Sequence, residues 1–310
     1  MKRASLVPRF GKEVVLQAAN LSNPEARFLV ANYYTAQEMR KRNDMQLRHL
    51  GEKDGAPILP MLLNKSADSF AVIESEIMKG LQVYADSTQL GRWCQSNDGI
   101  GPVITSGLLA HLDITKAPTA GHFWSFAGLN PDMVWEKGQK RPYNADLRQI
   151  CWHLGQCVKR LQKDKNAYYR QIYEVRKDYV VNKNETGMNA ERAKTFRTRT
   201  PEVMALLKTG KLPAITIDSQ ACNYVAKMFL SHLHALMYWD HYGTPPVKPF
   251  AIAIMGHTHE IEIPNTHMFP GFAKAYYKGP LGDEIERRDR TANENIAQEE
   301  PKKASRRTRK

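Results

Sequence analysis

The segment Asp98-Gly99-Ile100-Gly101-Pro102-Val103 combines residue types that suit a phosphate-binding turn. Helical patterns precede and follow it, so we expect a helix-hairpin-helix. Glycine allows positive φ and close backbone approach, and the first amides of the next helix can hold a phosphate. Ile100 is expected to point inward and fix the turn. We predict that this hairpin grips nucleic-acid backbone without reading bases, through Gly99, Ile100, Gly101 and Val103.

A strongly basic segment follows the hairpin. Residues 137–199 hold 16 basic and 6 acidic residues and so carry most of the formal net charge of +13. Such clustering indicates a polyanionic partner, although a solvated helix face is the alternative. A helix from Asn144 would place five cations within about 60° of one another, opposite an apolar face. These cations are Arg148, Lys159, Lys163, Arg170 and Lys177. The predicted phosphate contacts are Lys140, Arg141, Asn144, Arg148, Lys159, Lys163 and Arg170.

Two other groups of residues have chemical alternatives. Gly256-His257-Thr258-His259-Glu260 resembles the metal-binding end of calcineurin-like phosphoesterases. His257 and His259 would share one side of an extended chain, but we favour contacts with phosphate or backbone over a metal. Asp218 is expected to cap a helix after a strand rather than to act in catalysis. No cofactor is predicted with certainty, and Mg²⁺ is expected only if the chain is an enzyme.

Aromatic and histidine side chains are interpreted mainly as packing residues. Tyr168, Tyr169 and Tyr173 lie among basic residues, yet this spacing favours helix packing over base stacking. Trp135, beside Lys140, is interpreted in the same way. His232 and His234 are expected on a helix surface.

Several stretches resemble the C-terminal domain of insertion-sequence 110/116 family transposases. GIGPVITSGLLAHLDITKAPTAGHFWSFAGLNP (99–131) has the family's hairpin and its A-G-L-x-P ending. KRPYNADLRQICWHLGQCV (140–158) is similar to the basic turn and helix that follow. The end of 219–265, PPVKPFAIAIMGHTHEIEIPN, resembles members from phages and plasmids. The likeness covers residues 66–265 in patches and implies a role in DNA transposition and recombination.

The chain also departs from this family. The resemblance implies an N-terminal nuclease-like domain with Asp and Glu metal ligands on strands, but we expect helices before residue 98. It also implies a nucleophilic serine after the G-L-x-P motif, whereas DMVWEKGQKRPYN (132–144) contains no serine. Cleavage needs a nucleophile or metal-activated water beside the phosphate. We therefore expect nucleic-acid binding without strand cleavage by this chain alone.

The elements that must position these residues are predicted to be mainly α-helical, with few short strands. Helices are expected over 23–49, 67–93, from 144 onward and over 219–238, and strands over 214–217, 251–255 and 260–263. The predicted divisions are a helical segment and linker (1–60), a long coiled-coil-like helix (61–98), a transposase-like helix-hairpin-helix domain (99–280) and a disordered charged tail (281–310). Apolar positions from Phe70 to Tyr84 favour packing within the domain, with a homo-oligomer through 67–93 as the alternative.

Composition limits the remaining classes. The chain has 310 residues, 42% of them apolar, and no apolar run near the ~20 residues that span a bilayer. Cys94, Cys151, Cys157 and Cys222 form no C-x-x-C pair, as expected for reduced thiols in the cytoplasm. The basic tail 302–310 could add phosphate contacts or only solubility. We predict a DNA- or RNA-binding, transposase-like protein, with DNA favoured and no membrane partner. The alternatives are an active transposase and a metal-dependent phosphoesterase.

Overall fold

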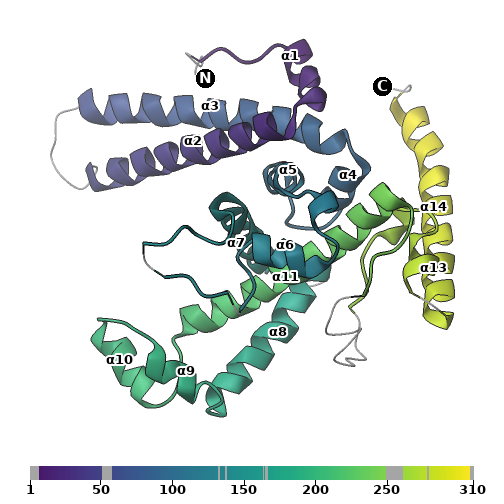
Figure 1. The fold of residues 1–310 in the computed structure, drawn as a ribbon. Helices are drawn as coiled ribbons and strands as arrows, with labels where there is room; N and C mark the ends of the chain where they lie inside the picture. The colour runs from purple at the N-terminus through teal and green to yellow at the C-terminus, as the bar shows by residue number, and fades with distance from the viewer. Residues whose placement is uncertain are drawn as a thin grey trace. The chain divides into compact units, whose positions relative to one another are not determined.

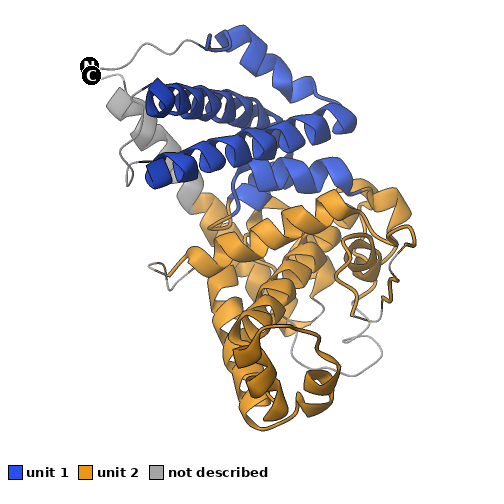
Figure 2. Cartoon of the chain, turned by 90° about the vertical axis from the view of Figure 1, so that its left-hand side faces the viewer, with its two compact units in different colours: residues 1–95, 100–112 blue, residues 96–99, 113–310 orange. Residues whose placement is uncertain are grey.

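The computed structural model describes residues 7–50, 58–131, 133–136, 138–162, 164, 167–248, 261–277 and 279–307, with side chains as far as residue 294. These residues are mainly helical, which confirms the predicted fold class, and no strand occurs among them. The chain forms two compact units (Figure 2). Unit 1 contains residues 1–95 and 100–112, and unit 2 contains residues 96–99 and 113–310. This division differs from the predicted one, because the helix after the hairpin belongs to unit 1.

Unit 1 is built on two long helices that lie side by side (Figure 1), α2 (Asn23–Leu50) and α3 (Ile58–Asp86). The small residues Ala26, Val30 and Ala36 are buried on α2, which allows the close approach of α3. Arg40 on α2 pairs with the buried Glu74 on α3 through two hydrogen bonds of 2.6 and 3.2 Å. The unit also contains the following elements: α1 (Lys12–Gln17), η1 (Ala18–Asn20), α4 (Gln89–Gln95) and α5 (Pro102–His111).

The helix expected over 67–93 is two helices, because the chain turns between Asp86 and Gln89. Gly91 makes this turn possible, since a Cβ at that position would lie 1.9 Å from the Ala85 carbonyl oxygen. The second half of the apolar seam is buried inside the unit, where Tyr84 packs with Ala26 and Ala110. That half of the seam is therefore used within the unit, as the favoured interpretation expects.

Unit 2 is organised around α11 (Ala214–Tyr242), which packs against α6 (Ala120–Phe126), α7 (Ala145–Arg160) and α8 (Tyr168–Glu185). Val225, Phe229 and Leu233 are fully buried along α11, so this helix forms the centre of the core. The other elements of the unit are η2 (Ile114–Lys116), α9 (Ala190–Thr195), α10 (Pro201–Lys208), η3 (Thr266–Met268), α13 (Phe272–Tyr276) and α14 (Pro280–Arg307).

Several local predictions for unit 2 are wrong. Residues 214–217 start α11 instead of forming a strand, so Asp218 lies inside a helix and does not cap one. His232 and His234 are buried, not on the surface. Residues 261–263 are not a strand, and 251–255 lie outside the described residues. The tail expected to be disordered is helical as far as Arg307.

The expected basic helix is also interrupted. α7 ends at Arg160 and α8 begins at Tyr168, so a single helical register does not run from Arg148 to Lys177. Among the helices that the structure describes, none is both long and apolar enough to cross a membrane.

Candidate nucleic-acid interface

The hairpin lies between α4 and α5. Gly99 has a φ of +85°, the left-handed region that favours glycine, and a Cβ there would lie 3.0 Å from Cδ1 of Leu161. Gly101 caps α5 with extended backbone, and its carbonyl accepts a 3.0 Å hydrogen bond from the Thr105 amide. Ile100 is buried, as predicted. Gly99 and Ile100 therefore have the expected local conformation, while the helix-hairpin-helix motif and phosphate binding by this turn stay predictions.

Access to the start of α5 is narrow. Pro102 is its first residue and has no amide N–H, which leaves the amides of Val103 and Ile104 as the free donors of the first turn. The side chains of these two residues are buried where α5 packs on α2 and α3. Gly101 and Pro102 are partly exposed. A phosphate would thus have to approach over these two residues.

The A-G-L-x-P motif (127–131) follows α6 and is held against the start of α7. Gly128 has a φ of +66°, and a Cβ there would lie 2.7 Å from the Tyr143 ring. Arg148 on α7 donates a hydrogen bond to the Gly128 carbonyl. Asn144 caps α7, because its Oδ1 accepts a 2.9 Å hydrogen bond from the Leu147 amide. Two predicted phosphate ligands, Arg148 and Asn144, are therefore engaged in holding the fold.

Another predicted ligand, Lys159, belongs to a polar network around Asp218. Its Nζ lies 2.5 Å from Asp218 Oδ2, while Lys177 Nζ lies 2.8 Å from Oδ1. The Tyr173 hydroxyl donates a 2.5 Å hydrogen bond to the same Oδ1. The network joins α7, α8 and α11, so it stabilises the packing of these helices.

The charges in this network set the protonation of its members. Burial alone would raise the pKa of Asp218, but the hydrogen bonds from Lys159, Lys177 and Tyr173 outweigh it and hold that pKa well below its usual range. Burial, together with the hydrogen bond to Asp218, raises the pKa of the Tyr173 phenol. Asp218 is thus an anion that neutralises two of the basic residues. Sequence reasoning missed this role because it placed Asp218 at a helix start.

The Arg170 side chain also contacts residues of this network and its neighbours. Its guanidinium donates hydrogen bonds to the Lys159 carbonyl and to Glu174, and it lies over the Tyr173 ring at 4.9 Å. Tyr169 and Tyr173 are buried, as the packing interpretation predicts. The Tyr168 hydroxyl donates to the Glu262 carbonyl. Lys163 lies outside the described residues.

Two predicted ligands remain exposed on the connection between α6 and α7. Lys140 and Arg141 are solvent-exposed and form no ion pair within the residues that the structure describes. The Arg141 guanidinium lies 5.8 Å from the Trp135 ring, and the Trp135 indole N–H donates a 2.8 Å hydrogen bond to the Gln139 carbonyl. The connection thus presents two cations beside an aromatic residue, Trp135, that is 42% exposed.

No group of three or more His, Cys, Asp or Glu side chains that could hold a metal occurs in the described part of the chain. His257 and His259 lie outside that part, so the metal hypothesis for them stays a prediction. The four cysteines are free, as expected, and burial raises the pKa of Cys151 to about 12.

Residues 91–170 match the family described as Transposase IS116/IS110/IS902 family. The matched residues include the hairpin, the A-G-L-x-P motif, the exposed connection and α7. This match supports a transposase-like protein and agrees with the sequence resemblance. It spans 80 of the 310 residues. No curated protein and no solved structure matches the chain.

Proposed function

We propose that this transposase-like protein of a mobile element or phage binds DNA through the sugar-phosphate backbone, without cleaving it alone. The observation that carries the proposal is the pair of exposed cations, Lys140 and Arg141, inside the segment that matches the transposase family. A phosphate can replace the water around these cations without breaking an ion pair. The hairpin at Gly99 and Gly101 is a second contact of the same backbone-directed kind.

The exposed connection offers more than charge. A guanidinium forms two parallel hydrogen bonds with a phosphate, which suits Arg141 better than a point charge would. The indole N–H of Trp135 is already satisfied by Gln139, so its ring face is the part left for a ligand. A sugar or an unpaired base can pack on such a face. Backbone contacts beside one aromatic ring predict binding that depends strongly on salt and weakly on sequence.

The absence of cleavage in this proposal rests on the segment that follows the A-G-L-x-P motif. Residues 132–144 contain no serine, the residue that the family resemblance implies as nucleophile. Without a nucleophile or a metal-activated water beside the phosphate, a phosphodiester bond is not broken at a useful rate. Incubation with supercoiled plasmid and Mg²⁺ tests this part. An intact supercoiled plasmid is expected, and nicking or strand joining would favour an active recombinase.

The binding itself is tested by the salt dependence of affinity for a labelled duplex. The double variant Lys140→Gln/Arg141→Gln should reduce the slope of log affinity against log salt by about 1.8, or about 0.9 for each phosphate that is no longer neutralised. The control is Lys41→Gln/Arg48→Gln on α2, which removes the same charge from exposed residues that form no ion pair within the described part of the chain. The control should keep the wild-type slope. Equal slopes for both double variants would contradict the proposed contacts.

A further inference from the structure

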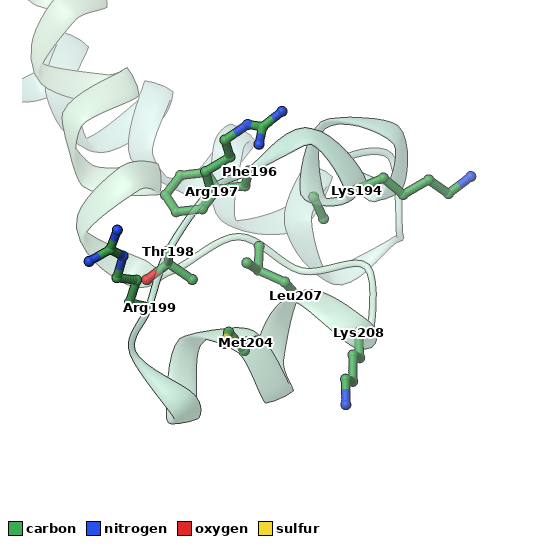
Figure 3. A pocket seen from close by; sticks show the side chains of 9 residues that line it. Lys194, Phe196, Arg197, Thr198, Arg199, Met204, Leu207 and Lys208 are labelled. Carbon is green, nitrogen blue, oxygen red and sulfur yellow. The ribbon is translucent and has the colours of Figure 1, made fainter.

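A cationic pocket lies at one end of unit 2, on the hairpin of α9 and α10. The two short helices are joined by residues 196–200, whose sequence is Phe-Arg-Thr-Arg-Thr. Within residues 186–211 there are six basic and two acidic residues. The pocket has a volume of about 930 Å³ and opens widely to solvent (Figure 3). It lies beyond residue 170, outside the segment that matches the transposase family.

The base of this helical hairpin is held in place by buried amides. The Asn184 side chain donates a 3.1 Å hydrogen bond to the Leu212 carbonyl and accepts a 2.9 Å hydrogen bond from the Leu212 amide. Asn189 donates a further 3.0 Å hydrogen bond to Asn184. Lys211 pairs with Glu185 at the same place. These contacts join the chain just before α9 to the chain just after α10, so they fix the position of the helical hairpin that contains the pocket.

The pocket itself is not built as a core. No residue of α10 is buried, and Met204 is 48% exposed although it is apolar. Phe196 and Leu207 are half-buried beside it. Figure 3 shows these three apolar side chains between cationic side chains that extend outward from the rim in different directions. Apolar surface that a fold leaves open beside charges is typical of a binding surface.

Three of the four cations on this rim are available to a ligand, and the fourth, Lys194, has a carboxylate partner. Lys194 pairs with Glu191 at 2.5 Å. Arg197, Arg199 and Lys208 are exposed and form no ion pair within the described residues. In this respect they differ from Lys159 and Arg170, whose charges are used inside unit 2.

We propose that the α9–α10 pocket binds the sugar-phosphate backbone of a nucleic-acid strand. Arg197 and Arg199 hold phosphates, and the Phe196 ring contacts a sugar or an unpaired base. Guanidinium groups match phosphate oxygens in pairs, and an aromatic ring next to them favours a single strand over a duplex. This inference rests on the proposed function for the class of ligand, but it adds a site that the hairpin and the α6–α7 connection do not supply.

The test measures fluorescence anisotropy of a labelled 20-nucleotide single strand and of a duplex of the same length. The variant Arg197→Gln/Arg199→Gln should reduce the single-strand salt slope by about 1.4 and affinity at 0.1 M salt about 25-fold, or about fivefold for each arginine. The control is Arg27→Gln/Arg48→Gln, which removes the same charge from exposed residues on α2 that form no ion pair within the described part of the chain. Lys replacements at positions 197 and 199 should restore most of the slope.

The outcomes separate this inference from the proposed function. If wild-type protein binds neither probe, both fail. If it binds but the arginine variant behaves like the α2 control, the pocket inference fails and the proposed function stands. If poly-glutamate displaces the probe as well as heparin does, the surface is one for acidic protein segments, and the inference is overturned. Thermal unfolding of each variant at the wild-type temperature confirms that the weaker binding is not caused by unfolding.

Discussion

Replacing Lys159 by Gln separates a structural lysine from a phosphate-binding one. Two lysine ammonium groups contact the Asp218 carboxylate. The substitution removes one of them, together with the 2.5 Å hydrogen bond between Lys159 Nζ and Asp218 Oδ2. A hydrogen bond to a charged group contributes about 1.5–3 kcal/mol when buried. The Lys159 side chain is 37% exposed, so solvent screening reduces this contribution, and we expect a destabilisation of about 1.5 kcal/mol. For a unit of this size, that change lowers Tm by about 3–6 °C.

The assay pairs calorimetry with the salt dependence of DNA binding. Lys159→Gln should lower Tm and leave the salt slope at the wild-type value, because its charge is already neutralised. Lys140→Gln, the matched comparison, should do the reverse, with an unchanged Tm and a slope lower by about 0.9. If Lys159→Gln kept the wild-type Tm and lowered the slope, Lys159 would be leaving Asp218 to bind phosphate, and the reasoning would be refuted.

The pH dependence of this difference has a definite sign. The pKa of Asp218 in the folded protein is lowered from an ordinary value of 3.8. Above that ordinary value the carboxylate is charged in both states, and the full stabilisation from its pairing is present. As pH falls below it, the unfolded chain takes up a proton first, and the stabilisation declines until the folded carboxyl is also protonated. The Tm difference between wild type and Lys159→Gln should therefore shrink in acid.

Three further substitutions test other features of the structure. Gly128→Ala should destabilise unit 2 by about 1–3 kcal/mol in chemical denaturation, because of its positive φ and the nearby Tyr143 ring. Gly101→Ala meets no atom within 4 Å, so it should preserve Tm and weaken DNA binding if a phosphate lies against that backbone. Burial lowers the pKa of His232 to about 3, against a weaker opposing effect of the hydrogen bond that its ring donates to the backbone of Ile261. Below pH 6.5 the unfolded chain thus binds more protons at this residue than the folded chain does. The free energy of unfolding of the wild type should therefore decrease by about 1.4 kcal/mol for each unit by which the pH is lowered, and that of His232→Gln should decrease less steeply.

Helices with a clear apolar period could be predicted from the sequence, whereas their interruptions could not. The cap at Asn144 and the apolar face from Leu147 to Val158 follow from local pattern, and α7 contains both. The break after Arg160 coincides with a tertiary contact that no local pattern announces, since Leu161 lies beside Gly99. Ala-Ile-Thr-Ile at 214–217 has the β-branched composition of a strand, yet it starts the buried α11. Ile215 is 77% exposed, so burial of this first turn does not explain the helix, and a four-residue apolar run does not by itself distinguish a strand from a helix.

In the candidate site, too, local features could be predicted from the sequence, whereas contacts between distant residues could not. Counting charges locates a basic segment, but it does not show which cations have partners elsewhere in the chain. The carboxylate that neutralises Lys159 is 59 residues away, on a helix that no local pattern connects to α7. Four other cations lie in connections between helices and form no ion pair within the described residues: Lys140, Arg141, Arg197 and Arg199. Apart from Lys208 on α10, the exposed cations that the two proposals use therefore lie where the chain runs between helices, and that is where binding is expected to depend most on salt.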